Sequence, residues 1–186
     1  MYYNETKTRF QYLDGSPGSR YNDAEVMIMF RPMRRIRQEL PENEALNLLK
    51  NRPRGVLAVL GDEDYPYAVP MDFVYDPSDH SLNFHCAVEG HKLDAVRRHA
   101  KASFCVLDEG VPDETGDFYY FNSVIVFGQI REVADADEKV AKLRLLGNKY
   151  FPTTAMTEED IAKNGARALV LSLSIEHVTG KHVHER

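Results

Sequence analysis

Apolar and polar positions alternate over much of the chain beyond residue 54, which indicates a protein built mainly of β-strands. The runs 55–60 and 67–75 are separated by the polar turn Gly61–Asp64, a spacing typical of an antiparallel hairpin. In the last strand-like run, Leu169, Leu171, Leu173 and Ile175 are expected to face inward, and Ser172 and Ser174 outward. The other predicted strands cover 82–87, 102–107, 119–133 and 168–175.

Helical spacing accounts for most of the remaining pattern. Pro41 and the acidic Glu42 and Glu44 begin a helix that ends before Pro53, because proline and acids suit a first helical turn. A shorter helical segment follows Lys92, and another begins near Thr157. A charged helix is predicted over 135–150, with Val140, Leu143 and Leu146 facing inward.

Six strands with hairpin spacing and a few short helices predict a mainly β (α+β) fold. An antiparallel barrel with peripheral helices fits this order better than a doubly wound parallel sheet. Residues 1–33 are rich in Tyr, Asn, Gly, Ser and Arg and differ from the rest. They are interpreted as an N-terminal arm that precedes one domain over 34–186.

Composition excludes several classes of protein. The 186 residues are 43% hydrophobic, and no apolar run approaches the roughly 20 residues that a membrane helix needs. The 23 Lys and Arg against 29 Asp and Glu give a net charge of -6, which disfavours a non-specific nucleic-acid binder. Cys86 and Cys105 lie in strand-like runs without a C-x-x-C motif, so they are expected to be small core side chains. No secretory signal is visible, and a reduced cytoplasmic location is expected.

The segment from Phe84 to Lys92 carries the clearest chemical signal. A strand ends there, Gly90 allows a tight turn, and a helix begins with Lys92 in its first turn. The free N–H groups of a helix N-terminus bind phosphate, and an anion would offset the repulsion between Lys92 and the positive helix end. In the alternative interpretation, Lys92 simply extends into solvent.

His85 has two interpretations as well. Strand alternation places it on the side opposite Leu82 and Phe84. There it could face a ligand ring or donate a proton, or it could be a half-buried histidine with satisfied hydrogen bonds.

Other common sites lack support in the sequence. There is no G-x-G-x-x-G motif, no P-loop and no G-x-S-x-G elbow. H-E-x-x-H is absent, and the C-terminal His177, His182 and His184 have no cysteine beside them, so no metal site is predicted.

Five segments occur in the order and spacing of a known group: RRIRQELPENEALNLL, YAVPMDFVYD, LNFHCAVEGHKLDAVRR, SVIVFGQIREV and LVLSLSIEHVTGK. Over residues 34–183 the chain resembles the nitroimidazole-resistance (Nim-type) branch of the pyridoxamine-5'-phosphate-oxidase-like FMN-binding split barrels. The resemblance implies a six-stranded antiparallel split β-barrel with peripheral helices. It also implies a homodimer with FMN at the subunit interface.

The resemblance further implies which residues contact the cofactor. The isoalloxazine edge lies beside the stretch Pro70, Met71, Asp72 and Phe73, and the cofactor is lined by His85, Cys86 and Ala87 at the end of a strand. The phosphate is bound at a helix start by His91 and Lys92. Lys181 lies near the ring, and Ser123 lies on the strand that reaches the partner's flavin.

Two functions remain open at this stage. In the first, the protein is an FMN-dependent oxidoreductase that passes electrons to a small planar acceptor such as a nitroaromatic compound, and His85 positions the acceptor or supplies a proton. In the second, it is a non-catalytic flavin- or haem-binding protein, with His85 or a C-terminal histidine as an axial ligand. The arginine and tyrosine residues expected to hold pyridoxamine phosphate are not found, which disfavours the oxidase activity itself.

Overall fold

The computed structural model describes residues 7–8, 26–27 and 30–184. The chain divides into two units, Met1–Arg34 and Arg35–Arg186. In the first unit, β1 (Lys7–Thr8) and β2 (Val26–Met27) form a short antiparallel pair. Most of the predicted N-terminal arm lies outside the described residues, so the arm stays a prediction.

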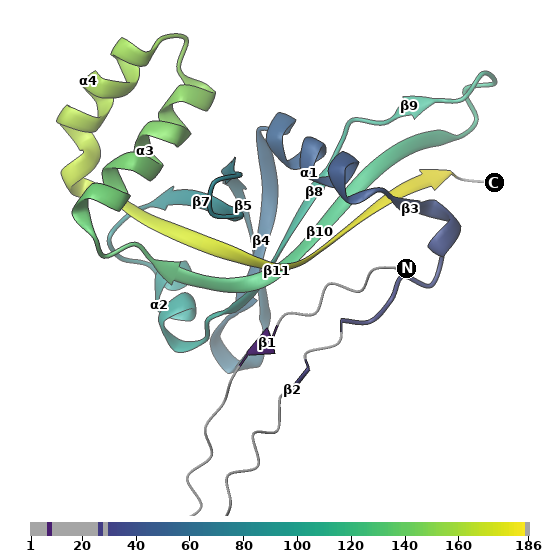
Figure 1. Cartoon of the computed structure of the whole chain (residues 1–186), viewed down its shortest axis with the longest axis horizontal. Coiled ribbons are helices and arrows are strands. Elements are labelled where there is room, and N and C mark those ends of the chain that lie inside the picture. Colours follow the sequence, from purple (N-terminus) through teal and green to yellow (C-terminus); the bar gives the residue numbers. More distant parts are fainter. Residues whose placement is uncertain (1–6, 9–25, 28–29, 185–186) are drawn as a thin grey trace, which may run out of the picture. The chain divides into compact units, whose positions relative to one another are not determined.

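An antiparallel sheet forms the body of the second unit (Figure 1). Seven strands follow the order β5-β4-β8-β10-β11-β7-β6, and the short strands β3 and β9 pair with β11 and β10. The sheet curls far enough for β5 to contact β7, which is not its neighbour in the sheet. The predicted split-barrel class is therefore confirmed. The nine strands are β3 (Glu39–Leu40), β4 (Arg54–Leu60), β5 (Pro66–Asp72), β6 (Val74–Asp76), β7 (Ser81–Cys86), β8 (Lys101–Leu107), β9 (Val111–Pro112), β10 (Tyr119–Glu132) and β11 (Leu169–His184).

The strand count exceeds the predicted six because one predicted strand is divided and two short strands were not expected. The predicted strand 67–75 breaks at Phe73, where the chain changes partners. Asp72 is still paired with Arg54 of β4, whereas Val74 is already paired with Asn83 of β7. The Phe73 side chain is fully buried against Phe104, with ring centroids 4.7 Å apart, and so forms the centre of the core.

The strands β10 and β11 pair along almost their whole length, with one irregularity. Phe127 is opposite His177, but Gly128 is opposite Ile175, which leaves Glu176 as an extra residue on β11. Gly128 is necessary here because a Cβ atom would lie 1.9 Å from the Ser174 carbonyl oxygen.

Within residues 30–184, four α-helices lie around the sheet (Figure 1): α1 (Glu42–Asn51), α2 (His91–Arg98), α3 (Ala136–Tyr150) and α4 (Thr154–Asn164). Single-turn 3-10 helices lie at Ile36–Gln38, Asp62–Asp64 and Gly165–Arg167. The Asp135 carboxylate caps α3 by accepting from the N–H groups of Asp137 and Glu138, and Thr153 caps α4. The last helix therefore begins three residues earlier than predicted. None of the helices in the described ranges is long and apolar enough to cross a bilayer.

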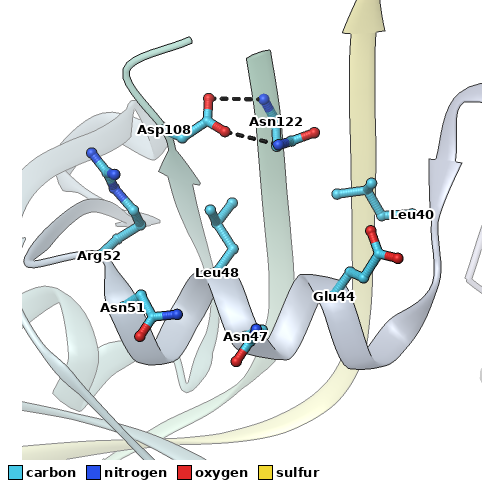
Figure 2. A pocket seen from close by; sticks show the side chains of 8 residues that line it. All are labelled: Leu40, Glu44, Asn47, Leu48, Asn51, Arg52, Asp108 and Asn122. Carbon is cyan, nitrogen blue, oxygen red and sulfur yellow. Dashed lines mark hydrogen bonds between the residues drawn. The ribbon is translucent and has the colours of Figure 1, made fainter. Parts of the chain in front are cut away.

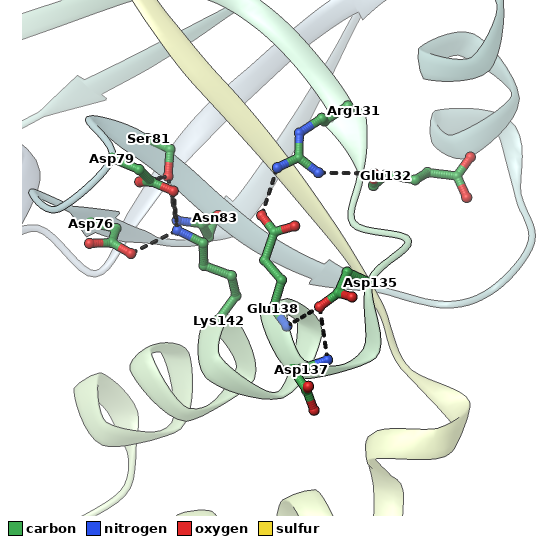
Figure 3. A network of polar contacts seen from close by, with 10 residues as sticks. All are labelled: Asp76, Asp79, Ser81, Asn83, Arg131, Glu132, Asp135, Asp137, Glu138 and Lys142. Atoms are coloured by element: carbon green, nitrogen blue, oxygen red, sulfur yellow. Dashed lines mark hydrogen bonds and ion pairs between the residues drawn. The ribbon is translucent and has the colours of Figure 1, made fainter.

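The inward face of α3 differs from the prediction. Leu146 is buried as expected, but Val140 and Leu143 are only half-buried, and the buried residue one turn before Leu146 is Lys142. Its ammonium group donates to Asp76 at 2.7 Å, to Asp79 at 2.5 Å and to Ser81 at 3.4 Å (Figure 3). Helix α3 thus packs on β6, β7 and β11 through a polar cluster, which hydrophobic spacing does not reveal.

Two further expectations about burial are wrong. Ser172 was expected to face solvent but is 2% exposed, because α3 packs on the second face of β11. Cys86 and Cys105 were expected inside the core, but both are half-buried and neither forms a disulfide.

Candidate functional site

The start of α2 has the features predicted for an anion site. Gly90 adopts φ 129°, in a region that favours glycine, and provides no side-chain cap. Its carbonyl accepts from Leu93 and Asp94, so the N–H groups of His91 and Lys92 are the ones left at the helix start. A Cβ on Gly90 would meet no atom within 4 Å, which means that the space beside the turn is open.

Lys92 is the basic residue at this helix start whose charge is not neutralised by a protein carboxylate. Its ammonium nitrogen lies 3.1 Å from the Met71 sulfur and contacts no carboxylate among the described residues. By contrast, Arg97 pairs with Glu132 and Arg98 with Asp62, both at 2.6 Å. A thioether is a weak acceptor, so Lys92 retains charge and hydrogen-bonding capacity for an anion.

His91 joins the start of α2 to the β4–β5 turn. Its ring stacks on Tyr67 with centroids 4.1 Å apart, and its Nε2 lies 3.3 Å from Asp62. Asp62 also accepts from Arg98, so one carboxylate of the turn holds both ends of α2. The turn and the helix start are therefore fixed relative to each other.

The end of β7 lies beside this helix start. His85 is exposed and Phe84 is fully buried, but Asn83, expected on the same side as His85, is fully buried as well. Burial raises the pKa of the Cys86 thiol, while the nearby Lys92 ammonium acts to lower it. Ala87 follows β7 and lies on the surface.

The stretch Pro70–Phe73 contributes alternately to two faces. Met71 and Phe73 are buried, and Met71 contacts Lys92. Pro70 is exposed, and Asp72 accepts a hydrogen bond from Arg54 at 2.7 Å. Met71 thus lies against Lys92, and the stretches Pro70–Phe73, His85–Ala87 and His91–Lys92 are here called the Lys92 group.

Ser123 and Lys181 form a separate group. Ser123 of β10 is directly opposite Lys181 of β11. Ile125 lies two residues after Ser123 on β10 and therefore on the same face of the sheet. Cross-strand partners lead from Pro70 through Val56 and Cys105 to Ile125. This row crosses three strand spacings of about 4.8 Å each, so Pro70 and Ile125 are about 14 Å apart along the sheet. Within one chain, Ser123 and Lys181 are therefore separated from Pro70 by the strands β4 and β8.

Two polar residues at the end of α3, Lys149 and Tyr150, contact the stretch Pro70–Phe73 and were not predicted. Lys149 donates to the Phe73 carbonyl at 2.9 Å, and the Tyr150 hydroxyl accepts from the Phe73 N–H at 2.8 Å. Burial lowers the pKa of Lys149 to about 8, against the opposing effect of Asp72, and burial raises the pKa of Tyr150. No motif marks these residues, because their partners are backbone atoms far away in the sequence.

A pocket of about 350 Å³ lies between α1 and the ends of β8 and β10 (Figure 2). On its strand side, Asp108 accepts from the backbone and side-chain nitrogens of Asn122 at 2.9 and 2.8 Å. No predicted site residue lines it, although Asn122 adjoins Ser123. The lining consists of Leu40, Glu44, Asn47, Leu48, Asn51, Arg52, Asp108 and Asn122.

Comparison with known proteins gives one family match. The family model described as pyridoxamine 5'-phosphate oxidase matches residues 41–182. Among curated proteins, none matches the sequence significantly.

Several solved structures share the fold. A candidate 5-nitroimidazole antibiotic resistance protein from Bacteroides thetaiotaomicron is 18% identical, with a TM-score of 0.65 over 78% of this chain and 87% of that one. The FAD binding protein from Mycobacterium smegmatis is 21% identical, with a TM-score of 0.58 over 80% and 99%. An FAD and heme binding protein from the same organism is 25% identical, with a TM-score of 0.63 over 77% and 72%.

Proposed function

This chain belongs to the pyridoxamine 5'-phosphate oxidase family, and from that membership and the site geometry we propose that it binds a flavin, specifically FMN. The family match confirms the resemblance noted in the sequence. We also propose that the protein passes electrons from the reduced flavin to a small planar acceptor, with nitroaromatic compounds as the first class to test. The structural relatives described as FAD-binding, FAD- and heme-binding and linked to nitroimidazole resistance support this proposal.

The observation that carries the proposal is the start of α2. One ammonium without a carboxylate partner, two N–H groups at a helix start and open space beside Gly90 together suit a phosphate monoester. FMN ends in one such group. Lys92 and the N–H groups of His91 and Lys92 would hold it.

The other members of the Lys92 group would contact the rest of the flavin. Pro70 has no N–H to donate to a sheet ladder, so its surroundings leave an irregular strand edge that a ring system can approach. Cys86 and Ala87 would line the cofactor, and the exposed His85 would position the acceptor or supply a proton to it. The bound flavin supplies the electron transfer, and the protein supplies binding and electrostatics.

We further propose that the protein is a homodimer. The outward face of the sheet exposes large apolar side chains in neighbouring strands: Val56 is 38% exposed, Ile125 40% and Phe127 39%, and Leu107 is 56% exposed at the end of β8. Val56 and Ile125 are joined through Cys105 in one cross-strand row, so they form a continuous patch. A second copy would cover this patch and bring its own Ser123 and Lys181 toward the Lys92 group.

The first experiment is an absorption spectrum of the purified protein before and after addition of FMN or FAD and desalting. A flavin band that survives desalting, with FMN retained better than FAD, is the expected result. A colourless protein would refute flavin binding. A Soret band on titration with haem, without retained flavin, would instead support the haem-binding alternative.

Lys92→Ala tests the phosphate contact. We expect FMN affinity to fall about tenfold or more, because a charge-assisted hydrogen bond is lost, while the exposed Lys163→Ala on α4 retains full affinity. Equal affinity in the two variants would refute the role of Lys92.

Turnover is tested with the loaded protein, a reduced nicotinamide donor and a nitroaromatic acceptor. His85→Ala is expected to lower the rate, whereas His99→Ala, at an exposed position after α2, is not. Tight FMN binding without any turnover would favour a non-catalytic flavoprotein.

A further inference from the structure

At Phe73, the stretch Pro70–Phe73 that is predicted to run beside the flavin changes its partner strand. Its predecessor Asp72 ends the pairing with β4, and its successor Val74 begins the pairing with β7. Phe73 itself belongs to neither ladder. Its N–H and carbonyl groups are buried with the residue, so they need partners from elsewhere.

The carboxyl end of α3 provides those partners. The Phe73 N–H donates to the Tyr150 hydroxyl at 2.8 Å, and the same hydroxyl lies 2.9 Å from the Phe73 carbonyl oxygen. The Lys149 ammonium donates to that carbonyl at 2.9 Å and lies 4.1 Å from the centre of the Phe73 ring. Both peptide groups of Phe73 and its ring are thus held by two consecutive residues of α3.

The same two side chains also hold the loop between α1 and β4. Lys149 donates to the Arg52 carbonyl at 2.6 Å, and the Tyr150 hydroxyl contacts the Pro53 carbonyl. Tyr150 has one hydroxyl proton and can donate to only one of its two carbonyl neighbours at a time, while Lys149 has three protons for its contacts. Lys149 and Tyr150 therefore bridge the β5–β6 junction to a second, independently anchored segment.

We propose that Lys149 and Tyr150 are positioning residues for the flavin site, which they serve by fixing Phe73 and hence the path of Pro70–Asp72. This inference rests on the proposed flavin-binding function. Met71, two residues before Phe73, is the residue that contacts Lys92, so displacement of Phe73 changes the strand edge and the surroundings of the phosphate anchor together. Neither α3 residue need touch the cofactor.

The test compares two mild variants that weaken α3 at different points. Tyr150→Phe removes the hydroxyl at Phe73 and keeps the ring. Asp79→Asn weakens the contact with Lys142, two turns earlier on the same helix, and leaves Phe73 untouched. Tyr150→Phe is expected to bind FMN about tenfold more weakly than the wild type, and Asp79→Asn to bind it within about twofold. Lys149→Met is expected to resemble Tyr150→Phe.

Hydrogen exchange without flavin provides the second measurement. In Tyr150→Phe, amide exchange in a peptide covering residues 70–76 is expected to increase. In Asp79→Asn, the amides of residues 70–73 in that peptide are expected to stay as protected as in the wild type. Unchanged exchange in Tyr150→Phe would overturn the inference. So would equal losses of FMN affinity in both variants, because these would indicate a general loss of stability.

The wild-type protein separates this inference from the proposed function. If the wild type binds neither FMN nor FAD, the proposed function fails and the inference fails with it. If the wild type binds FMN and Tyr150→Phe and Lys149→Met bind it equally well, the flavin proposal stands and the positioning role is refuted.

Discussion

Replacement of Lys142 by methionine is expected to destabilise the protein strongly, because it leaves a buried carboxylate without its cation. The Lys142 ammonium is 2.7 Å from Asp76, and both side chains are less than a tenth exposed (Figure 3). Asp79, the second carboxylate, is 44% exposed and can be hydrated after the change. The cost therefore arises mainly at Asp76.

Removal of one partner of a buried ion pair costs about 3–5 kcal/mol. Asp76 keeps the hydrogen bonds from the N–H and hydroxyl of Ser78, at 2.9 and 2.7 Å, so we expect the lower end, about 3 kcal/mol. For a chain of this length that corresponds to a decrease in Tm of about 6–12 °C. The measurement is urea unfolding followed by far-ultraviolet circular dichroism, since the chain has no tryptophan.

The loss should also depend on pH. Burial works to raise the pKa of Asp76, but the hydrogen bonds from Lys142 and Ser78 outweigh it and lower the pKa below its usual value. A lowered pKa means that the pair contributes stability above the unfolded pKa of about 3.9, and that this contribution is lost as the pH falls through the folded value. In Lys142→Met the hydrogen bond from Lys142 is absent, so burial raises the pKa of Asp76 relative to the wild type and the carboxylate takes up a proton in the folded variant at a higher pH. The variant therefore regains stability between pH 7 and pH 4, where the wild type changes little, and the difference between the two proteins is expected to shrink. A loss below about 1 kcal/mol, or one that is equal at both pH values, would refute this account.

Three further predictions concern other parts of the fold. Gly128→Ala is expected to lower the free energy of unfolding by about 3 kcal/mol, since a Cβ would collide with the Ser174 carbonyl; a neutral result in urea unfolding would show that the β11 irregularity relaxes easily. Ile125→Asp is expected to convert a dimer into folded monomers in light scattering, because it places a charge in the exposed sheet patch; a monomeric wild type would refute the dimer. Alkylation of Cys86 and Cys105 by iodoacetamide, followed by mass spectrometry, is expected to be slower near neutral pH than for a free thiol and to accelerate at alkaline pH, because burial raises the pKa of both thiols; rapid labelling near neutral pH would contradict this.

Local pattern was sufficient for the elements of the fold and for one part of the candidate site. Alternation predicted β4, β7, β8 and β10, because a half-buried strand needs an apolar residue at every second position. The Gly90 turn followed by Lys92 predicted an uncapped helix start with a nearby cation, because glycine geometry and helix-end N–H groups are local properties. The resemblance to a family then indicated which other segments to consider with Lys92.

What the sequence pattern could not provide were contacts between distant residues. At the break, Phe73 is hydrogen-bonded to Lys149 and Tyr150, 76 and 77 residues later, and those contacts are to backbone atoms that carry no residue-specific signal. The inward face of α3 was predicted from apolar spacing, yet Lys142 is buried there because Asp76 and Asp79 arrive from a separate turn. The last strand was predicted over 168–175, but β11 continues to His184 because its second half pairs with the first half of β10 and with β3.

Local periodicity and the geometry of glycine and proline were enough to predict the longer strands, the helices and the phosphate-like turn, but not the short strands β3 and β9 or the division of β5 from β6. The contact of Met71 with Lys92, the pairing of Ser123 with Lys181 and the packing of α3 through lysines became visible only in the folded chain. The physical reason is that a buried polar group or a strand that changes partners is stable only if a distant residue supplies the missing hydrogen bond. That supply depends on the three-dimensional path of the whole chain.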